Sequence, residues 1–306
     1  MVSPKANQRK TLVSDDNAVP MKILSYLSII VVFELLLLTL ITVNKKLLSN
    51  DNLAVGRISI SNDLPSEIDF QPIVDEWVNS FDSMKSVIIY DLDRNEIAGE
   101  YNSSASYYTA SLYKLFVAYE GYTILQSGEW KDDDACGKTG LTILNCLDLA
   151  IRESDSKCAE TLWSMIGTKK LDKIMKEKYD ITDSDLANFA TTPKDVLKMM
   201  TIYYGHLEIS DEALLARMRD SLLNQPETDY NWRQGLPSGF KNANVYNKVG
   251  WDYNFEEEHW NYYHDAAIIE YPEDNRHFVV VVMTKNTPYQ KLRELGNKIE
   301  DNYYNQ

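Results

Sequence analysis

The sequence predicts an α/β (α+β) protein in which strands from both ends of the chain form one antiparallel sheet, with a helical insertion between them. The first observation is a stretch of helical apolar spacing over residues 72–81, followed by the strand sequence SVIIYDL. After a turn at residues 93–95, EIAGEYN can pair back as a hairpin. The second observation is a run of three strand sequences near the C-terminal end, NANVYNKVGW, YYHDAAIIEY and HFVVVVMTK.

The helical insertion runs from Ser111 to about Leu223, where apolar residues recur at helical spacing with breaks such as Gly128 and Pro193. The sequence HFVVVVMTK has the unbroken apolar run expected of a buried central strand. A helix over residues 288–303 is predicted to follow it.

Length and composition favour one folded domain plus a tail, because 306 residues with 44% hydrophobic and 25% charged residues can bury a sizeable core. The formal net charge of -15 argues against nucleic-acid binding, which requires clustered Lys and Arg. The histidines are scattered and form no zinc-binding pattern, so neither a metal nor a cofactor is expected.

Residues 23–43 read as a transmembrane helix, because they are apolar apart from Glu34 and their number suits a bilayer core. Basic residues are more numerous before this segment than after it, which favours a cytoplasmic N-terminus and an extracytoplasmic domain. A secretory signal peptide is the alternative. The expected order is a short cytoplasmic tail (1–22), a single-pass helix in the lipid bilayer (23–43), a stalk (44–70) and a folded domain (71–306).

The cysteines Cys136, Cys146 and Cys158 fall in one short stretch of the domain expected outside the membrane, where a disulfide can persist. Pairing of Cys136 with Cys146 is favoured because it closes a short loop that contains glycine. The other two pairings remain open.

Ser111 stands three residues before Lys114 at the start of an apolar helix, so both side chains are expected on one helical face. A serine hydroxyl becomes a useful nucleophile when a base takes its proton, and a desolvated lysine amine can be that base. The positive end of the helix also suits the Ser111 amide to stabilise a developing oxyanion. Ser and Lys at this spacing also occur by chance, so this pair alone is weak.

Two further motifs follow in order, Ser154-Asp155-Ser156 and Lys248-Val249-Gly250. With SLYK at Ser111, they make the sequence similar to the class A β-lactamases and penicillin-binding proteins, whose signatures are S-x-x-K, S-D-N and K-T-G. The resemblance covers residues 71–306, and TTPKDVLKMM and the pair His264-Asp265 also match it. It implies a class A β-lactamase-like fold.

The resemblance also implies roles for individual residues. Ser111 would be the nucleophile with Lys114 as its helper, and Ser154 would relay a proton to the leaving nitrogen. Lys248 would hold the substrate carboxylate. The implied substrate-binding residues are Ser156, Gly250 and Trp251. Ser156 would contact the amide side chain of the substrate, and Trp251 would supply a second oxyanion amide.

The sequence departs from the family pattern in three places. Val249 replaces a hydroxyl residue that binds the substrate carboxylate, and Ser156 replaces an asparagine. The omega-loop signature, whose glutamate activates the deacylating water in class A enzymes, is missing between Gly167 and Thr191. Asp183 or Asp185 is a candidate to replace it.

The sequence therefore predicts an extracytoplasmic, membrane-anchored serine hydrolase whose domain is monomeric. Its expected partner is a small molecule, either a β-lactam or a cell-wall peptide amide derived from peptidoglycan. The alternatives are a penicillin-binding D,D-peptidase or esterase that releases its acyl group slowly, and a surface-binding module whose catalysis has lapsed.

Overall fold

The computed structural model describes residues 65–205, 208–226, 231–254 and 259–305. A compact unit is formed by Asp63–Gln306. The predicted tail (1–22), transmembrane helix (23–43) and most of the stalk lie outside the described residues. Within the described ranges, no helix is both long enough and apolar enough to cross a membrane.

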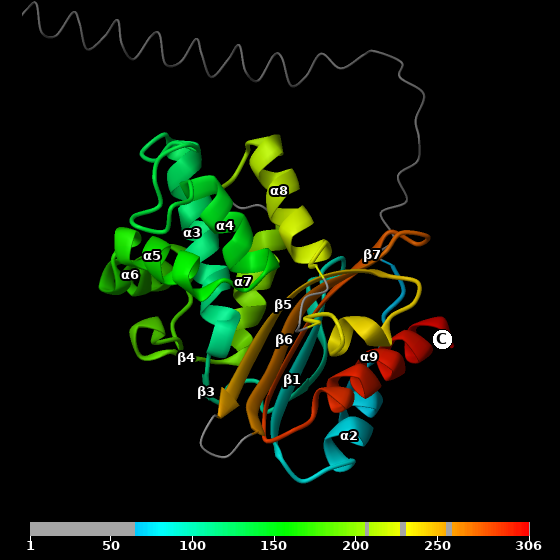
Figure 1. Ribbon diagram of the computed structural model, residues 1–306. Helices are drawn as coiled ribbons and strands as arrows, with labels where there is room; N and C mark the ends of the chain where they lie inside the picture. Colours follow the sequence, from blue (N-terminus) through cyan, green and yellow to red (C-terminus); the bar gives the residue numbers. More distant parts are fainter. Residues whose placement is uncertain (1–64, 206–207, 227–230, 255–258, 306) are drawn as a thin grey trace, which may run out of the picture. The chain divides into compact units, whose positions relative to one another are not determined.

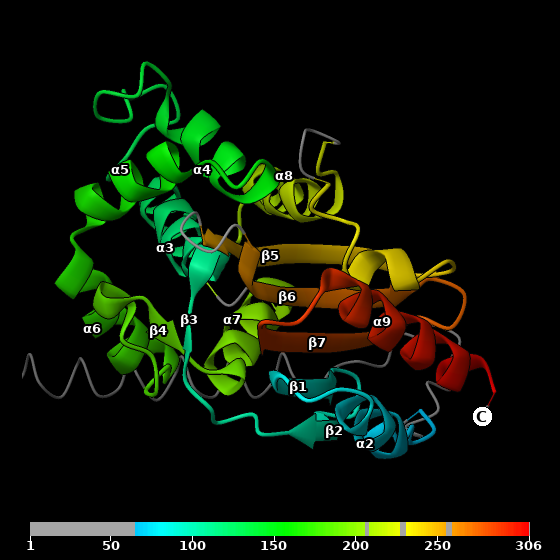
Figure 2. The ribbon, with the colours of Figure 1, turned by 60° about the horizontal axis from the view of Figure 1, so that its bottom comes forward.

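A five-stranded antiparallel sheet forms the centre of this unit, with the strand order β2-β1-β7-β6-β5. Figure 2 shows the N-terminal strands β1 and β2 lying beside strands from the other end of the chain. The predicted arrangement, one antiparallel sheet of N-terminal and C-terminal strands split by a helical insertion, is therefore confirmed. The strands of this sheet are β1 (Met84–Asp91), β2 (Glu96–Tyr101), β5 (Asn244–Asn254), β6 (His259–Tyr271) and β7 (Arg276–Lys285).

Helices cover both faces of the sheet (Figure 1). Helices α2 (Gln71–Asn79) and α9 (Tyr289–Tyr304) pack on one face, and the predicted helical insertion lies on the other. A short second sheet pairs β3 (Tyr107–Tyr108) with β4 (Ala190–Thr191). The remaining helices are η1 (Ala110–Leu112), α3 (Tyr113–Ser127), α4 (Ile143–Arg152), α5 (Ser156–Ile166), α6 (Thr168–Tyr179), η2 (Leu186–Asn188), α7 (Pro193–Gly205), α8 (Glu212–Leu223) and η3 (Leu236–Gly239).

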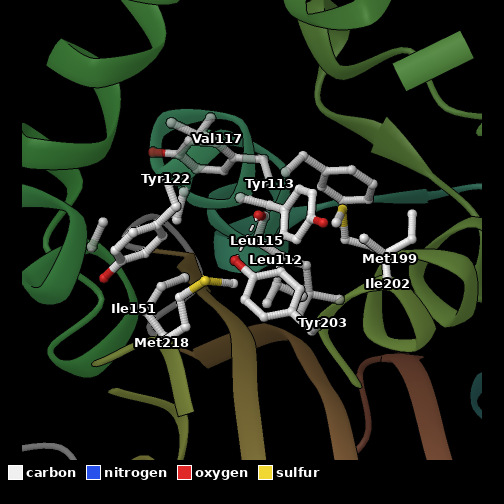
Figure 3. Close-up of a cluster of buried hydrophobic side chains, with 14 of the residues drawn as sticks. Leu112, Tyr113, Leu115, Val117, Tyr122, Ile151, Met199, Ile202, Tyr203 and Met218 are labelled. Atoms are coloured by element: carbon white, nitrogen blue, oxygen red, sulfur yellow. Dashed lines mark hydrogen bonds between the residues drawn. The ribbon is translucent and has the colours of Figure 1, made fainter. Parts of the chain in front are cut away.

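Two apolar clusters hold these layers together. The larger one surrounds α3, whose side chains are buried on almost every side, so this helix forms the centre of the helical block (Figure 3). In it the Tyr203 hydroxyl donates to the Leu115 carbonyl at 2.9 Å. The second cluster lies under α2 and α9 and includes Ile68 and Phe70, which the sequence assigned to the stalk. The packed domain thus begins a few residues earlier than residue 71.

Candidate active site

Ser111 lies in η1, directly before α3, and its side chain is partly exposed. The preceding residue, Ala110, has a φ of 44°, a left-handed conformation that costs a non-glycine residue about 1–3 kcal/mol. The neighbouring Thr109 amide donates to the Phe189 carbonyl at 2.7 Å. Such strain concentrates at functional sites, so the turn that presents Ser111 is a candidate nucleophile turn.

Lys114 is fully buried beneath Ser111. Its Nζ lies 3.0 Å from Ser111 Oγ, 3.0 Å from Ser156 Oγ and 3.2 Å from Ser154 Oγ. It also donates to the Ser154 carbonyl. Burial lowers the pKa of Lys114 to about 8, although the Asp155 and Glu160 carboxylates act in the opposite direction. At neutral pH a useful fraction of this amine is neutral, as a base for Ser111 requires.

Ser154 occupies the turn between α4 and α5 with a φ of 59°. This conformation accompanies the direct contact between its carbonyl and Lys114. Asp155 caps α5, because its Oδ1 accepts from the Cys158 amide at 2.7 Å. The interpretation of Asp155 as a brace of this loop therefore fits its geometry.

A disulfide joins Cys146 in α4 to Cys158 in α5, with 4.9 Å between the Cα atoms. The favoured sequence pairing, Cys136 with Cys146, is wrong: Cys136 is a buried free thiol. The two helices pack against each other on either side of the turn at Ser154, which brings Cys158 beside Cys146. The disulfide thus closes the base of the turn that contacts Lys114.

Lys248 of β5 contacts the same turn. Its Nζ donates to Ser154 Oγ at 2.9 Å and to the Val249 carbonyl at 2.9 Å. Burial, and then the charge of Lys114, hold the pKa of Lys248 well below its usual value. The Ser154 hydroxyl therefore connects the two buried lysines, which suits the predicted proton relay.

Gly250 and Trp251 follow Lys248 on β5, an edge strand of the large sheet that lies beside η1. A Cβ atom on Gly250 would lie 2.8 Å from Leu112 Cγ and 2.9 Å from the Thr109 carbonyl oxygen, so a glycine permits this approach. The side chains of Val249 and Trp251 are buried in the cluster under α9. The apolar side chain of Val249 is therefore directed away from the lysine pair.

His264 of β6 supports the chain just before Ser111. Its Nδ1 accepts from the Thr284 amide at 3.1 Å, so its Nε2 donates to the Tyr108 carbonyl at 2.9 Å. Burial lowers the pKa of His264 to about 4, which keeps the ring neutral. The sequence matched His264 to the family pattern but assigned it no role. In the structure its hydrogen bond to the Tyr108 carbonyl positions strand β3.

The segment at residues 180–192, which contains the candidate carboxylates Asp183 and Asp185, presents an aromatic side chain to Tyr113. The Phe189 ring packs against Tyr113 and Trp163, with 5.2 Å between ring centroids in both pairs. Asp183 and Asp185 are exposed, and Asp185 accepts from the Asn188 side chain at 2.8 Å. Neither aspartate is brought to Lys114 by any contact among the described residues. The aromatic group was missed in the sequence because its members are far apart in it.

A comparison with models of protein families identifies the family of this chain. The Beta-lactamase enzyme family matches residues 69–306. The chain belongs to this family. The match spans the part of the chain that carries Ser111, Lys114, Ser154 and Lys248, which the fold brings together. No match was found among curated proteins.

Solved structures of β-lactamases and of a penicillin-binding protein share the fold. The chain is similar to PBP-A at 15% identity, with a TM-score of 0.66 over 80% of this chain and 100% of PBP-A. It is also similar to the TLA-3 extended-spectrum beta-lactamase at 14% identity, with a TM-score of 0.65 over 78% of this chain and 98% of that enzyme. An ancestral class A β-lactamase has 15% identity and a TM-score of 0.64, over 76% of this chain and 99% of that protein. At these identities the similarity establishes the fold alone.

Proposed function

We propose that this protein is a serine hydrolase that forms an acyl-enzyme on Ser111 with a β-lactam or with a cell-wall peptide amide. The observation that carries the proposal is the 3.0 Å contact between Ser111 Oγ and the buried Lys114 amine. Lys114 takes the hydroxyl proton, Ser111 attacks the amide carbonyl, and Ser154 passes a proton to the leaving nitrogen. The Ser111 and Trp251 amides are the proposed oxyanion donors, and Ser156 and Gly250 border the substrate.

We further propose that the domain acts outside the cytoplasm, attached to a membrane through residues 23–43. The Cys146–Cys158 disulfide supports this location, because disulfides persist in oxidising compartments. The apolar sequence of residues 23–43 supports the anchor.

A penicillin-binding protein with slow acyl release is the second candidate function. It is favoured by Phe189, since the loop places an aromatic ring, and no carboxylate, beside Tyr113. Both candidates share acylation of Ser111 and differ in how fast the acyl group is released.

The test is to add a penicillin, a cephalosporin and a peptide ending in two D-alanines to residues 44–306 and to measure intact mass and product together. A hydrolase consumes substrate over many turnovers and shows a transient adduct. A penicillin-binding protein retains the β-lactam adduct and turns over slowly. The absence of both an adduct and a product with all three compounds would contradict the proposed function.

A further inference from the structure

The face of α5 that borders the site carries a carboxylate that lies outside the three family motifs. Ser156, Glu160 and Trp163 are separated by four and three residues, so they form one stripe along the helix. At one end of the stripe, Ser156 Oγ lies 3.0 Å from Lys114 Nζ. At the other end, the Trp163 ring packs against Tyr113 at 5.1 Å between centroids. Glu160 lies between these two contacts.

Residues spaced by four on a helix have Cβ atoms about 6 Å apart, so Glu160 lies beside Ser156 on the surface of α5. Burial lowers the pKa of Lys114, and the negative charge of Glu160, like that of Asp155, opposes this lowering. Burial raises the pKa of the hydroxyl of Tyr113, the third residue of the SLYK motif, and the charge of Glu160 adds to that rise. Glu160 is exposed and also lines an open surface groove with Lys157 and Thr161. Water can therefore reach the carboxylate from outside.

Three other carboxylates, on α5 and on the loop, are placed differently. Asp155, which also acts on Lys114, is engaged as the cap of α5. Asp185 accepts from Asn188 within its own loop, and Asp183 lies beside the carboxylate of Asp195, which accepts from the Asp183 amide at 2.8 Å. Among these carboxylates, Glu160 combines exposure to water with a place on the face of α5 that contacts Lys114 through Ser156.

We propose that Glu160 is the general base of deacylation, a role that rests on the proposed acyl-enzyme at Ser111. Glu160 takes one proton from a water molecule, and the water oxygen attacks the carbonyl carbon of the Ser111 ester. The bond from that carbon to Ser111 Oγ breaks, and the proton returns to Ser111 Oγ through Lys114. The products are a free carboxylic acid and the original serine, so no other reactant is required.

The experiment measures acylation and deacylation separately, by intact mass after mixing with a penicillin and after removing the excess, in the wild type and in Glu160→Gln. We expect acylation at or above the wild-type rate, because removing the negative charge lowers the pKa of Lys114 further. We expect the adduct to last about 100-fold longer or more, the effect of losing a general base. Hydroxylamine, a nucleophile that does not require this base, should release the acyl group from Glu160→Gln and the wild type at similar rates.

The matched control variants are Asp183→Asn and Asp185→Asn, which remove loop carboxylates of similar exposure. They should deacylate at the wild-type rate. The inference is overturned if Glu160→Gln deacylates like the wild type, if either loop variant is the slow one, or if the wild-type adduct is itself stable for hours. If the wild type forms neither an adduct nor a product with any substrate, the proposed function fails, and the inference falls with it. If the inference alone fails, the wild type still forms an adduct, and the adduct of Glu160→Gln lasts no longer than that of the wild type.

Discussion

The Ser111 side of the site and the loop that faces it contain opposite kinds of side chain. On the Ser111 side, two buried lysines and the Ser154 hydroxyl form a connected set of hydrogen bonds. On the loop side, Phe189 packs into an aromatic group, and the loop aspartates Asp183 and Asp185 are exposed. The polar side has the groups that acylation requires. The aromatic side lacks the carboxylate with which class A enzymes release the acyl group.

This difference separates the two chemical steps of the family. In the proposed mechanism, formation of the acyl-enzyme depends on groups fixed by the fold, because Lys114 and Lys248 are both held by the Ser154 turn. In the same mechanism, release depends on a group outside the loop, for which Glu160 on α5 is our proposal. Variants on the polar side should therefore change acylation, and variants of Glu160 should change release.

The largest effect on the polar side is expected for Lys114→Met. This variant nearly keeps the length of the side chain and removes the base, so acylation should slow by about 10²- to 10⁴-fold. The rate of adduct formation with a penicillin, measured by stopped reactions and intact mass, checks this. Lys157→Met, which removes an exposed lysine of α5, is the control and should leave the rate unchanged. An unchanged rate in Lys114→Met would remove the Lys114 amine from the mechanism.

A smaller effect is expected from pH. The lowered pKa of Lys114, about 8, means that its neutral form increases about tenfold per pH unit up to that value and then levels off. The acylation rate of the wild type should follow this curve between pH 6 and pH 9. A rate that is flat below pH 8, or that falls as pH rises toward 8, would show that a neutral Lys114 is not required.

The smallest effect on acylation is expected from the Cys146–Cys158 disulfide. It closes a loop with a sequence separation of 12, and such a cross-link contributes about 3 kcal/mol to the free energy of unfolding. Cys146→Ala with Cys158→Ala should lower stability by about that amount in urea titrations, while the folded fraction still acylates. Cys136→Ala, at the buried free thiol, tests the pairing, because a disulfide should still be present in that variant. Loss of the disulfide in Cys136→Ala would contradict the Cys146–Cys158 pairing.

The sequence was sufficient for the elements whose signals are local. The strand HFVVVVMTK is β7, a buried strand between β1 and β6, because an apolar run of this length has to be covered on both faces. The SLYK motif lies where a helix begins, and Lys114 reaches Ser111 as its spacing predicts.

The parts that were missed depend on long-range packing. The cysteine pairing depends on how α4 and α5 turn at Ser154, which spacing alone does not specify. The aromatic group depends on the loop reaching α5, so that Phe189 meets Trp163. Glu160 stands four residues after Ser156, which the sequence shows. That spacing indicates a place beside the site only when the contact of Ser156 with Lys114 is known. The proposed transmembrane helix remains a prediction.

The central claim is that the buried Lys114 amine activates Ser111 as the nucleophile. The most direct measurement is the intact mass of the wild type and of Ser111→Ala after reaction with a penicillin, combined with peptide mapping of any adduct. The account predicts an adduct on the peptide that contains Ser111 in the wild type, and none in Ser111→Ala. An adduct of equal yield in Ser111→Ala, or one that maps to another residue, would contradict it.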